Sequence, residues 1–313
     1  MPTPMRPFKA AVVQAGSILF DTRRTLDKLG DLAADAAGKG ANLVLFPEAF
    51  VGGYPKSMDF GARVGGRTPQ GRDEFLEYYN GAIEVPGPEC DRIAAAARAN
   101  KIHLVVGITE RAGGTLYCTA LTFAPDGSLA AKHRKVMPTA MERIVWGFGD
   151  GSTLPVIDTP LGKIGTVICW ENYMPLMRTA MYAKGIQIYC APTADDRDTW
   201  LPSMQMIALE GRCFVISACQ YLTSAAFPPG HSARRDGNEE KVLMRGGSCI
   251  VGTLGKVIVP PFFDREGIEV AELDLADTAR GKYDFDVVGH YARPDIFQLV
   301  VNESVQSPVV TKA

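Results

Sequence analysis

Short apolar runs of strand length alternate with segments of helical periodicity along the whole chain, and this alternation limits the possible folds more than any other feature. Residues 8–13 and 43–46 have the character of strands, and between them Leu26, Leu29 and Ala33 recur at helical spacing. Such alternation predicts layers of the α/β type. It does not by itself distinguish a doubly wound sheet from a sandwich of two sheets.

The same pattern continues to the last third of the chain. It predicts helices that begin near residues 88, 174 and 200. Further strands are expected at 102–108, 116–123, 128–131, 164–168, 186–189, 214–217, 248–251, 256–259 and 268–273. The polar stretch 228–241 is the best candidate for a mobile loop.

Composition and charge argue against several classes of protein. The formal net charge is −2 and no long basic or acidic block is present, so neither nucleic acid nor an anionic membrane is an expected partner. The longest apolar runs are far shorter than the roughly 20 residues of a membrane helix. Residues 1–7 hold three prolines and no apolar stretch of a secretory signal.

Cysteine usage indicates a reducing compartment. The seven cysteines form neither a CxxC pair nor a paired Cys/His spacing, so a disulfide framework and a metal site are both unexpected. Reduced thiols are typical of cytoplasmic proteins, and we expect that location.

Three apolar runs lead to a reactive side chain, namely Glu48, Lys135 and Cys169. A thiol beside a base and a fixed cation suits attack on a carbon–nitrogen bond. Cys169 stands where a buried strand gives way to a helix, and a helix start should lower the pKa of its thiol. Each residue alone also has an ordinary explanation: a core cysteine, a surface or capping glutamate, and a solvated basic cluster at 132–135.

The three contexts, in this chain order, resemble the nitrilase superfamily, whose Glu-Lys-Cys triad falls in them. The likeness covers about residues 9–303. Within the superfamily, the chain is similar to the true nitrilase branch, particularly its plant-type members. Further segments that carry it are Gly52-Gly53-Tyr54-Pro55, Met141-Glu142-Arg143, and residues 146–152, 190–195 and 289–295. The resemblance implies a four-layer αββα sandwich. It also implies a single domain over residues 1–313, with its core at about 9–303 and short terminal tails.

The resemblance also implies a role for each site residue. Cys169 would be the nucleophile, Glu48 the general base, and Lys135 a permanent positive charge beside the tetrahedral intermediate. Glu142 would support the lysine and the reacting water, although it could instead pair with its neighbour Arg143. The backbone N–H of Trp170 would complete an oxyanion hole with the lysine, while its indole could be ordinary core packing.

Two further residues are expected at the substrate. Tyr54 follows two glycines that let the backbone bend, and it either lines the pocket or is a hydrogen-bonded core tyrosine. Thr193 lies in the segment 190–195 and is placed with the substrate-binding residues. The other six cysteines are assigned to packing. The four histidines form no cluster, so a Cys-His pair is not expected, although distance in sequence alone does not exclude one.

The activity implied by the resemblance is hydrolysis of an organic nitrile to a carboxylic acid and ammonia, through a cysteine thioimidate and thioester. No metal or organic cofactor is needed. The expected partners are a small-molecule nitrile and further copies of the chain, in dimers and larger helical oligomers. Arylaliphatic nitriles are the favoured substrates, although Phe148 stands where many nitrilases have glutamine, which weakens any transfer of substrate preference.

Several alternatives remain open at this point. The chain could be a β-cyanoalanine nitrilase/hydratase, or an amidase or carbamoylase of the same superfamily. A nucleotide-binding α/β protein is disfavoured because both the G-x-G-x-x-G and the Walker lysine motifs are missing. The intact triad contexts argue against a purely structural filament protein.

Overall fold

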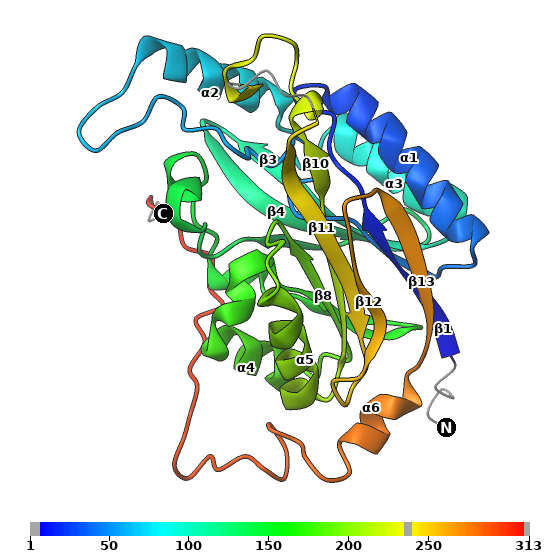
Figure 1. The fold of residues 1–313 in the computed structure, drawn as a ribbon. Coiled ribbons are helices and arrows are strands. Elements are labelled where there is room, and N and C mark those ends of the chain that lie inside the picture. The colour runs from blue at the N-terminus through cyan, green and yellow to red at the C-terminus, as the bar shows by residue number, and fades with distance from the viewer. Residues whose placement is uncertain (1–6, 235–239, 310–313) are drawn as a thin grey trace.

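Two β-sheets lie face to face, and each is covered on its outer side by helices (Figure 1). This arrangement is seen in a computed structural model that describes residues 7–234 and 240–309. It is the expected four-layer αββα sandwich. No helix in the described ranges is long and apolar enough to cross a membrane.

The first sheet has the strand order β13-β1-β2-β3-β4-β5. Strands β1, β2 and β3 are parallel, while β13, β4 and β5 pair antiparallel with their neighbours. Helices α1 (Thr22–Gly38) and α3 (Pro88–Asn100) cover its outer face. The strands are β1 (Pro7–Gln14), β2 (Leu43–Leu45), β3 (His103–Ala112), β4 (Thr115–Phe123), β5 (Leu129–Arg134) and β13 (Gly267–Asp274).

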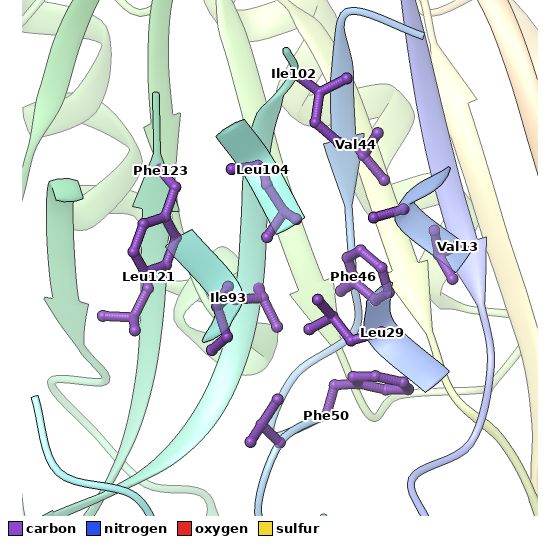
Figure 2. Packing of buried hydrophobic residues seen from close by; sticks show 14 of the residues in the cluster. Val13, Leu29, Val44, Phe46, Phe50, Ile93, Ile102, Leu104, Leu121 and Phe123 are labelled. Atoms are coloured by element: carbon purple, nitrogen blue, oxygen red, sulfur yellow. The ribbon is translucent and has the colours of Figure 1, made fainter. Parts of the chain in front are cut away.

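Alternate residues of these strands face opposite layers, because successive side chains in a strand point to opposite sides of the sheet. Val44 faces outward and belongs to the same buried cluster as Leu29 of α1 and Ile93 of α3, part of which Figure 2 shows. Leu43 and Leu45 face inward, toward the second sheet. Both faces are buried, which explains why these strands read as continuous apolar runs.

The second sheet has the order β10-β11-β9-β8-β7-β6, with β12 paired to β11. Helices α4 (Pro175–Ala183) and α5 (Trp200–Gly211) cover its outer face. Helix α6 (Ala276–Gly281) follows β13. The strands are β6 (Val156–Thr159), β7 (Gly162–Thr166), β8 (Ile188–Thr193), β9 (Phe214–Cys219), β10 (Tyr221–Thr223), β11 (Val242–Val251) and β12 (Val257–Phe263).

The structure differs from the expected elements in several places, and strands β6 and β10 and helix α6 are among the elements that were not predicted. Helix α2 (Pro69–Gly81) was not predicted, because few of its residues are buried and it shows little apolar periodicity. The predicted helix after the nucleophile is two helices, the 3-10 helix η3 (Cys169–Tyr173) and then α4, which Pro175 opens. In the expected mobile loop, a short 3-10 helix η5 (Ser232–Arg234) is present, and residues 235–239 lie outside the described ranges.

The ends of four strands, and the connections that follow them, bring reactive residues to one edge of the sandwich. Glu48 follows β2, Cys169 follows β7 and Thr193 ends β8, all at the carboxyl ends of parallel strands. Lys135 directly follows β5. The carboxyl ends of parallel strands are where ligands of α/β proteins usually bind.

Candidate active site

A buried lysine lies between two carboxylates at this edge. Lys135 Nζ donates to Glu48 Oε1 at 2.7 Å and to Glu142 Oε2 at 2.7 Å, and the lysine side chain is completely buried. Burial favours the neutral amine, but the negative charges around it, that of Glu48 first, outweigh burial and hold the pKa of Lys135 well above its ordinary value. Lys135 is therefore a permanent cation of the site and not part of a solvated basic cluster.

Glu48 is held by the turn that follows β2. Its carbonyl oxygen accepts from Gln220 Nε2 at 2.9 Å, and the next residue, Ala49, has the left-handed φ of 46°. Glu48 Oε2 has no hydrogen-bond partner among residues 7–234 and 240–309. Burial raises the pKa of the Glu48 carboxyl, and the charge of Glu142 adds to this, while Lys135 opposes it. A carboxylate with a free oxygen and a raised pKa suits a general base.

Cys169 is the first residue of η3 and sits in a strained turn. Its φ of 48° is rare for a residue other than glycine and requires support from its surroundings. Asn172 Nδ2 supplies this support by donating to the carbonyl oxygens of Val167 at 3.0 Å and Cys169 at 2.7 Å. Thr193 Oγ1 donates to the Cys169 sulfur at 3.2 Å, so this expected site residue contacts the thiol directly.

The expectation of a lowered thiol pKa at Cys169 is wrong. Burial raises the pKa of the thiol, the charge of Glu48 raises it further, and Lys135 offsets only part of the increase. The site already holds two carboxylate groups and one ammonium group, which leaves one negative charge in excess. A thiolate at Cys169 would raise this excess to two. The helix start offers little compensation, since η3 spans only five residues. Cys169 rests as a thiol, and its proton must leave as the new bond forms.

Glu142 and Tyr54 complete the polar wall of the site. Glu142 lies in the 3-10 helix η1 (Ala140–Ile144), and its Oε2 also accepts from the Thr139 N–H at 2.6 Å. Tyr54 donates its hydroxyl to Glu142 Oε1 at 2.7 Å, and burial and this carboxylate raise the pKa of Tyr54. Glu142 therefore pairs with Lys135 and not with Arg143, whose Nε donates to the Pro138 carbonyl.

Trp170 does not pack in the core. Its side chain is 40% exposed, its indole N–H donates to Asp195 Oδ2 at 2.8 Å, and Arg197 lies over its ring. Its backbone N–H lies in the first turn of η3, where N–H groups lack acceptors within the helix.

A cavity of about 260 Å³ lies against Tyr54 and Glu142. Its wall is mostly apolar and includes one lysine. Its lining includes Lys56, Met58, Phe60, Met141 and Ile144. Phe148, the departure from many nitrilases, is not among the lining residues and is exposed.

Sequence reasoning missed three neighbours of the triad. Cys118 Sγ lies 3.4 Å from Glu48 Oε1, although this thiol was assigned to packing. Glu171 is a fully buried carboxylate two residues after Cys169, and this spacing was the only signal for it. Gly107 lies beneath Glu48, and no local pattern indicates such a contact.

His133 is the histidine closest in sequence to the triad, but its ring nitrogens have other partners. Nδ1 contacts the carbonyl oxygen of Thr153, and Nε2 lies 2.9 Å from Glu171 Oε2. With both nitrogens engaged, His133 does not form a Cys-His pair.

The chain is similar to known proteins over nearly its whole length. The family profile described as Carbon-nitrogen hydrolase matches residues 9–283. The chain is 58% identical over 309 residues to an aliphatic nitrilase of Sinorhizobium fredii, covering 99% of this chain and 100% of the relative. It is 56% identical over 305 residues to a bifunctional nitrilase/nitrile hydratase of Nicotiana tabacum, covering 96% of this chain and 88% of that protein.

Solved structures share the fold at much lower identity. A carbon-nitrogen hydrolase from Helicobacter pylori aligns with a TM-score of 0.70 at 22% identity, covering 92% of this chain and 98% of that one. The NitFhit protein of C. elegans aligns with a TM-score of 0.75 at 20% identity, covering 98% of this chain and 70% of that one. These structural matches concern the fold alone. The family profile and the close relatives show that the chain belongs to the carbon-nitrogen hydrolase family and, within it, to the nitrilase branch.

Proposed function

We propose that the chain hydrolyses an organic nitrile to a carboxylic acid and ammonia, with Cys169 as nucleophile, Glu48 as general base and Lys135 as fixed cation. The observation that carries this proposal is the buried lysine held between two carboxylates at the edge where the thiol lies. The names of the close relatives, which are nitrilases of bacteria and plants, support the same activity. One catalytic domain over residues 1–313 would carry it.

The first half of the reaction forms a covalent adduct. The Cys169 sulfur bonds to the nitrile carbon while the thiol proton passes to Glu48 and then to the nitrile nitrogen, which gives a thioimidate. Water then adds to the same carbon, and Lys135 and the Trp170 N–H stabilise the charged tetrahedral species. Proton transfer to nitrogen lets ammonia leave, and a thioester remains.

The second half releases the acid. Glu48 takes a proton from a second water, whose oxygen bonds to the thioester carbon, and the C–S bond breaks to return the thiol. Glu142, held by Lys135 and Tyr54, would control which group leaves the earlier tetrahedral species. Loss of ammonia leads to acid, while loss of sulfur leads to an amide.

The cavity supports an arylaliphatic nitrile as the substrate. Its apolar wall, with Met58, Phe60, Met141 and Ile144, suits a hydrophobic side chain next to Glu142. One observation favours β-cyanoalanine as a second candidate. Lys56 lines the same cavity, and its ammonium has no ion-pair partner within the described part of the chain, so it could receive a substrate carboxylate.

We also propose self-association and a cytoplasmic location. Leu176 of α4 and Met206 of α5 are 66% and 52% exposed on the outer face of the second sheet, which suits a dimer contact that larger helical oligomers could extend. All seven cysteines are free, as a reducing compartment requires.

Side-by-side kinetics with an ammonia readout test the activity. The substrates are 3-phenylpropionitrile, β-cyanoalanine and the amide of each. We expect the nitriles to be processed faster than their amides and acid to be the main product. If every amide is faster than its nitrile, the chain is an amidase or carbamoylase.

Variants and mass spectrometry test the nucleophile. Cys169→Ala should abolish turnover and leave the fold intact, whereas Cys90→Ala should remain active. Intact-protein and peptide mass spectrometry during turnover should find an acyl adduct on Cys169. An adduct on another cysteine would refute the assignment.

A further inference from the structure

Glu171 joins the two chain segments that carry the nucleophile and the lysine. Its Oε1 accepts from the backbone N–H of Val136 at 2.6 Å, and its Oε2 accepts from the backbone N–H of Ile168 at 2.7 Å. Val136 directly follows Lys135, and Ile168 directly precedes Cys169. One carboxylate therefore holds the backbone next to both reactive residues.

This contact also crosses between the two sheets. Val136 extends from β5 of the first sheet, while Ile168 extends from β7 of the second. The carboxylate is completely buried, so water does not compete for its hydrogen bonds. A displacement of about 1 Å between reacting groups can cost about 100-fold in rate, so a fixed bridge of this kind bears directly on catalysis.

His133 supplies the charge that such a buried carboxylate needs. Its Nδ1 contacts the carbonyl oxygen of Thr153 and its Nε2 contacts Glu171 Oε2, so both nitrogens face oxygen atoms and a ring that carries both protons donates to each. Burial disfavours this cation, but the charge of Glu171 and the two hydrogen bonds outweigh burial and raise the pKa of His133. The result is a neutral buried pair that leaves the remaining lone pairs of Glu171 for the backbone.

We propose that Glu171 is a positioning residue that sets the separation of Cys169 and Lys135 through Ile168 and Val136, with His133 as its counterion. This inference rests on the proposed function, because it assumes that these two residues react together. Glu171 itself does not touch the substrate. Its loss should lower turnover without weakening substrate binding in proportion.

The test replaces Glu171 by glutamine, which keeps the shape but puts an NH₂ group where one acceptor oxygen stood. That group must then face a backbone N–H or the protonated His133 ring. The matched control is Glu110→Gln. Glu110 is equally buried, but it binds the side chains of Thr119, Lys132 and Arg134 and no backbone N–H beside a reactive residue.

We expect Glu171→Gln to lower kcat about 100-fold while KM stays within about threefold, because positioning and not binding is lost. Alkylation of Cys169 by iodoacetamide, followed by mass spectrometry, should continue within about threefold of the wild-type rate, since a small electrophile needs no exact alignment of the thiol with Lys135. Glu110→Gln should keep kcat within about threefold and show its effect in the melting temperature.

Two results would overturn the inference: a folded Glu171→Gln enzyme with wild-type kcat, or equal losses of kcat in both variants that follow their melting temperatures. If Glu171→Gln does not fold, His133→Gln takes its place, since it keeps an N–H donor but removes the charge. It should lose about tenfold in kcat, and wild-type kcat would again refute the proposal. A wild-type enzyme inactive on nitriles and amides would refute the proposed function itself.

Discussion

At the scale of single residues, the alternation of strand β5 explains how a basic cluster yields one catalytic cation. Lys132 and Arg134 turn to one side and both bind Glu110, whereas His133 and Lys135 turn to the other and are buried. These four residues therefore supply two partly exposed cations that bind the buried Glu110, and two side chains that lie in the interior. Their spacing of two residues decides which side chain belongs to which set.

The first prediction concerns Lys135. Lys135→Gln should abolish turnover and lower the free energy of unfolding by about 3–5 kcal/mol, because two buried carboxylates are left without their cation. Urea unfolding and ammonia release measure the two effects. Lys132→Gln is the control, since its side chain is 29% exposed and Arg134 remains on Glu110. A Lys135→Gln protein that unfolds at the wild-type urea concentration would contradict the buried ion pair.

The second prediction concerns the pH dependence of Cys169 reactivity. A raised thiol pKa means that the reactive thiolate is a small fraction at neutral pH and grows about tenfold per pH unit below that pKa. The rate of Cys169 alkylation by iodoacetamide should therefore rise steadily from pH 7 to 9 without a plateau. Peptide mass spectrometry separates it from the other buried thiols. A plateau already below pH 7.5 would show a lowered pKa instead.

At the scale of elements, strand β3 shapes the turn that presents Glu48. A Cβ atom on Gly107 would lie 2.6 Å from the Glu48 Cα and 2.5 Å from both the Pro47 carbonyl oxygen and the Ala49 nitrogen. Real Cβ atoms do not approach backbone so closely, and the surrounding backbone is buried and cannot move freely. Only glycine lets β3 and the turn after β2 lie in this contact.

The third prediction follows from that contact. Gly107→Ala should displace Glu48, lower kcat at least tenfold and cost about 1–3 kcal/mol of stability, as overpacking usually does. Kinetics and thermal melting measure these losses. Gly114→Ala is the control, because no atom lies within 4 Å of its added Cβ. Equal activity of the two variants would show that the turn can move without loss.

In the molecule as a whole, the helices that cover the second sheet carry exposed apolar side chains on their outer surface. Helices α4 and α5 bury one side against the sheet and expose Leu176 and Met206 on the other. Exposed apolar side chains that are close to one another mark contact surfaces more often than isolated ones do. This face is our candidate for association with a second copy.

The fourth prediction tests this face by light scattering. The wild-type chain should have at least twice the 33.8 kDa mass of one copy, and the double variant Leu176→Lys, Met206→Lys should shift it toward the single mass. Val64→Lys, at a fully exposed valine elsewhere, is the control. An active wild-type monomer, or a double variant of unchanged mass, would contradict this role of the face.

Features that depend on a local pattern could be predicted from the amino-acid sequence. The continuous apolar runs of β1 and β3 and the helical spacing in α1 predicted their elements, because the burial of each residue follows from the geometry of its own segment. The contexts of Glu48, Lys135 and Cys169 were likewise visible as short runs. Helix α2 was missed because it buries few residues and so leaves little periodic signal.

Features that depend on distance in space could be read only from the folded chain. The raised pKa of the Cys169 thiol results from burial and from the charges of Glu48 and Glu142, which outweigh the opposing charge of Lys135 and the local helix start. Glu171 and Gly107 gain their importance from residues dozens of positions away along the chain. Desolvation, charge and close packing sum over all neighbours whatever their order in the chain, so a local pattern does not contain them.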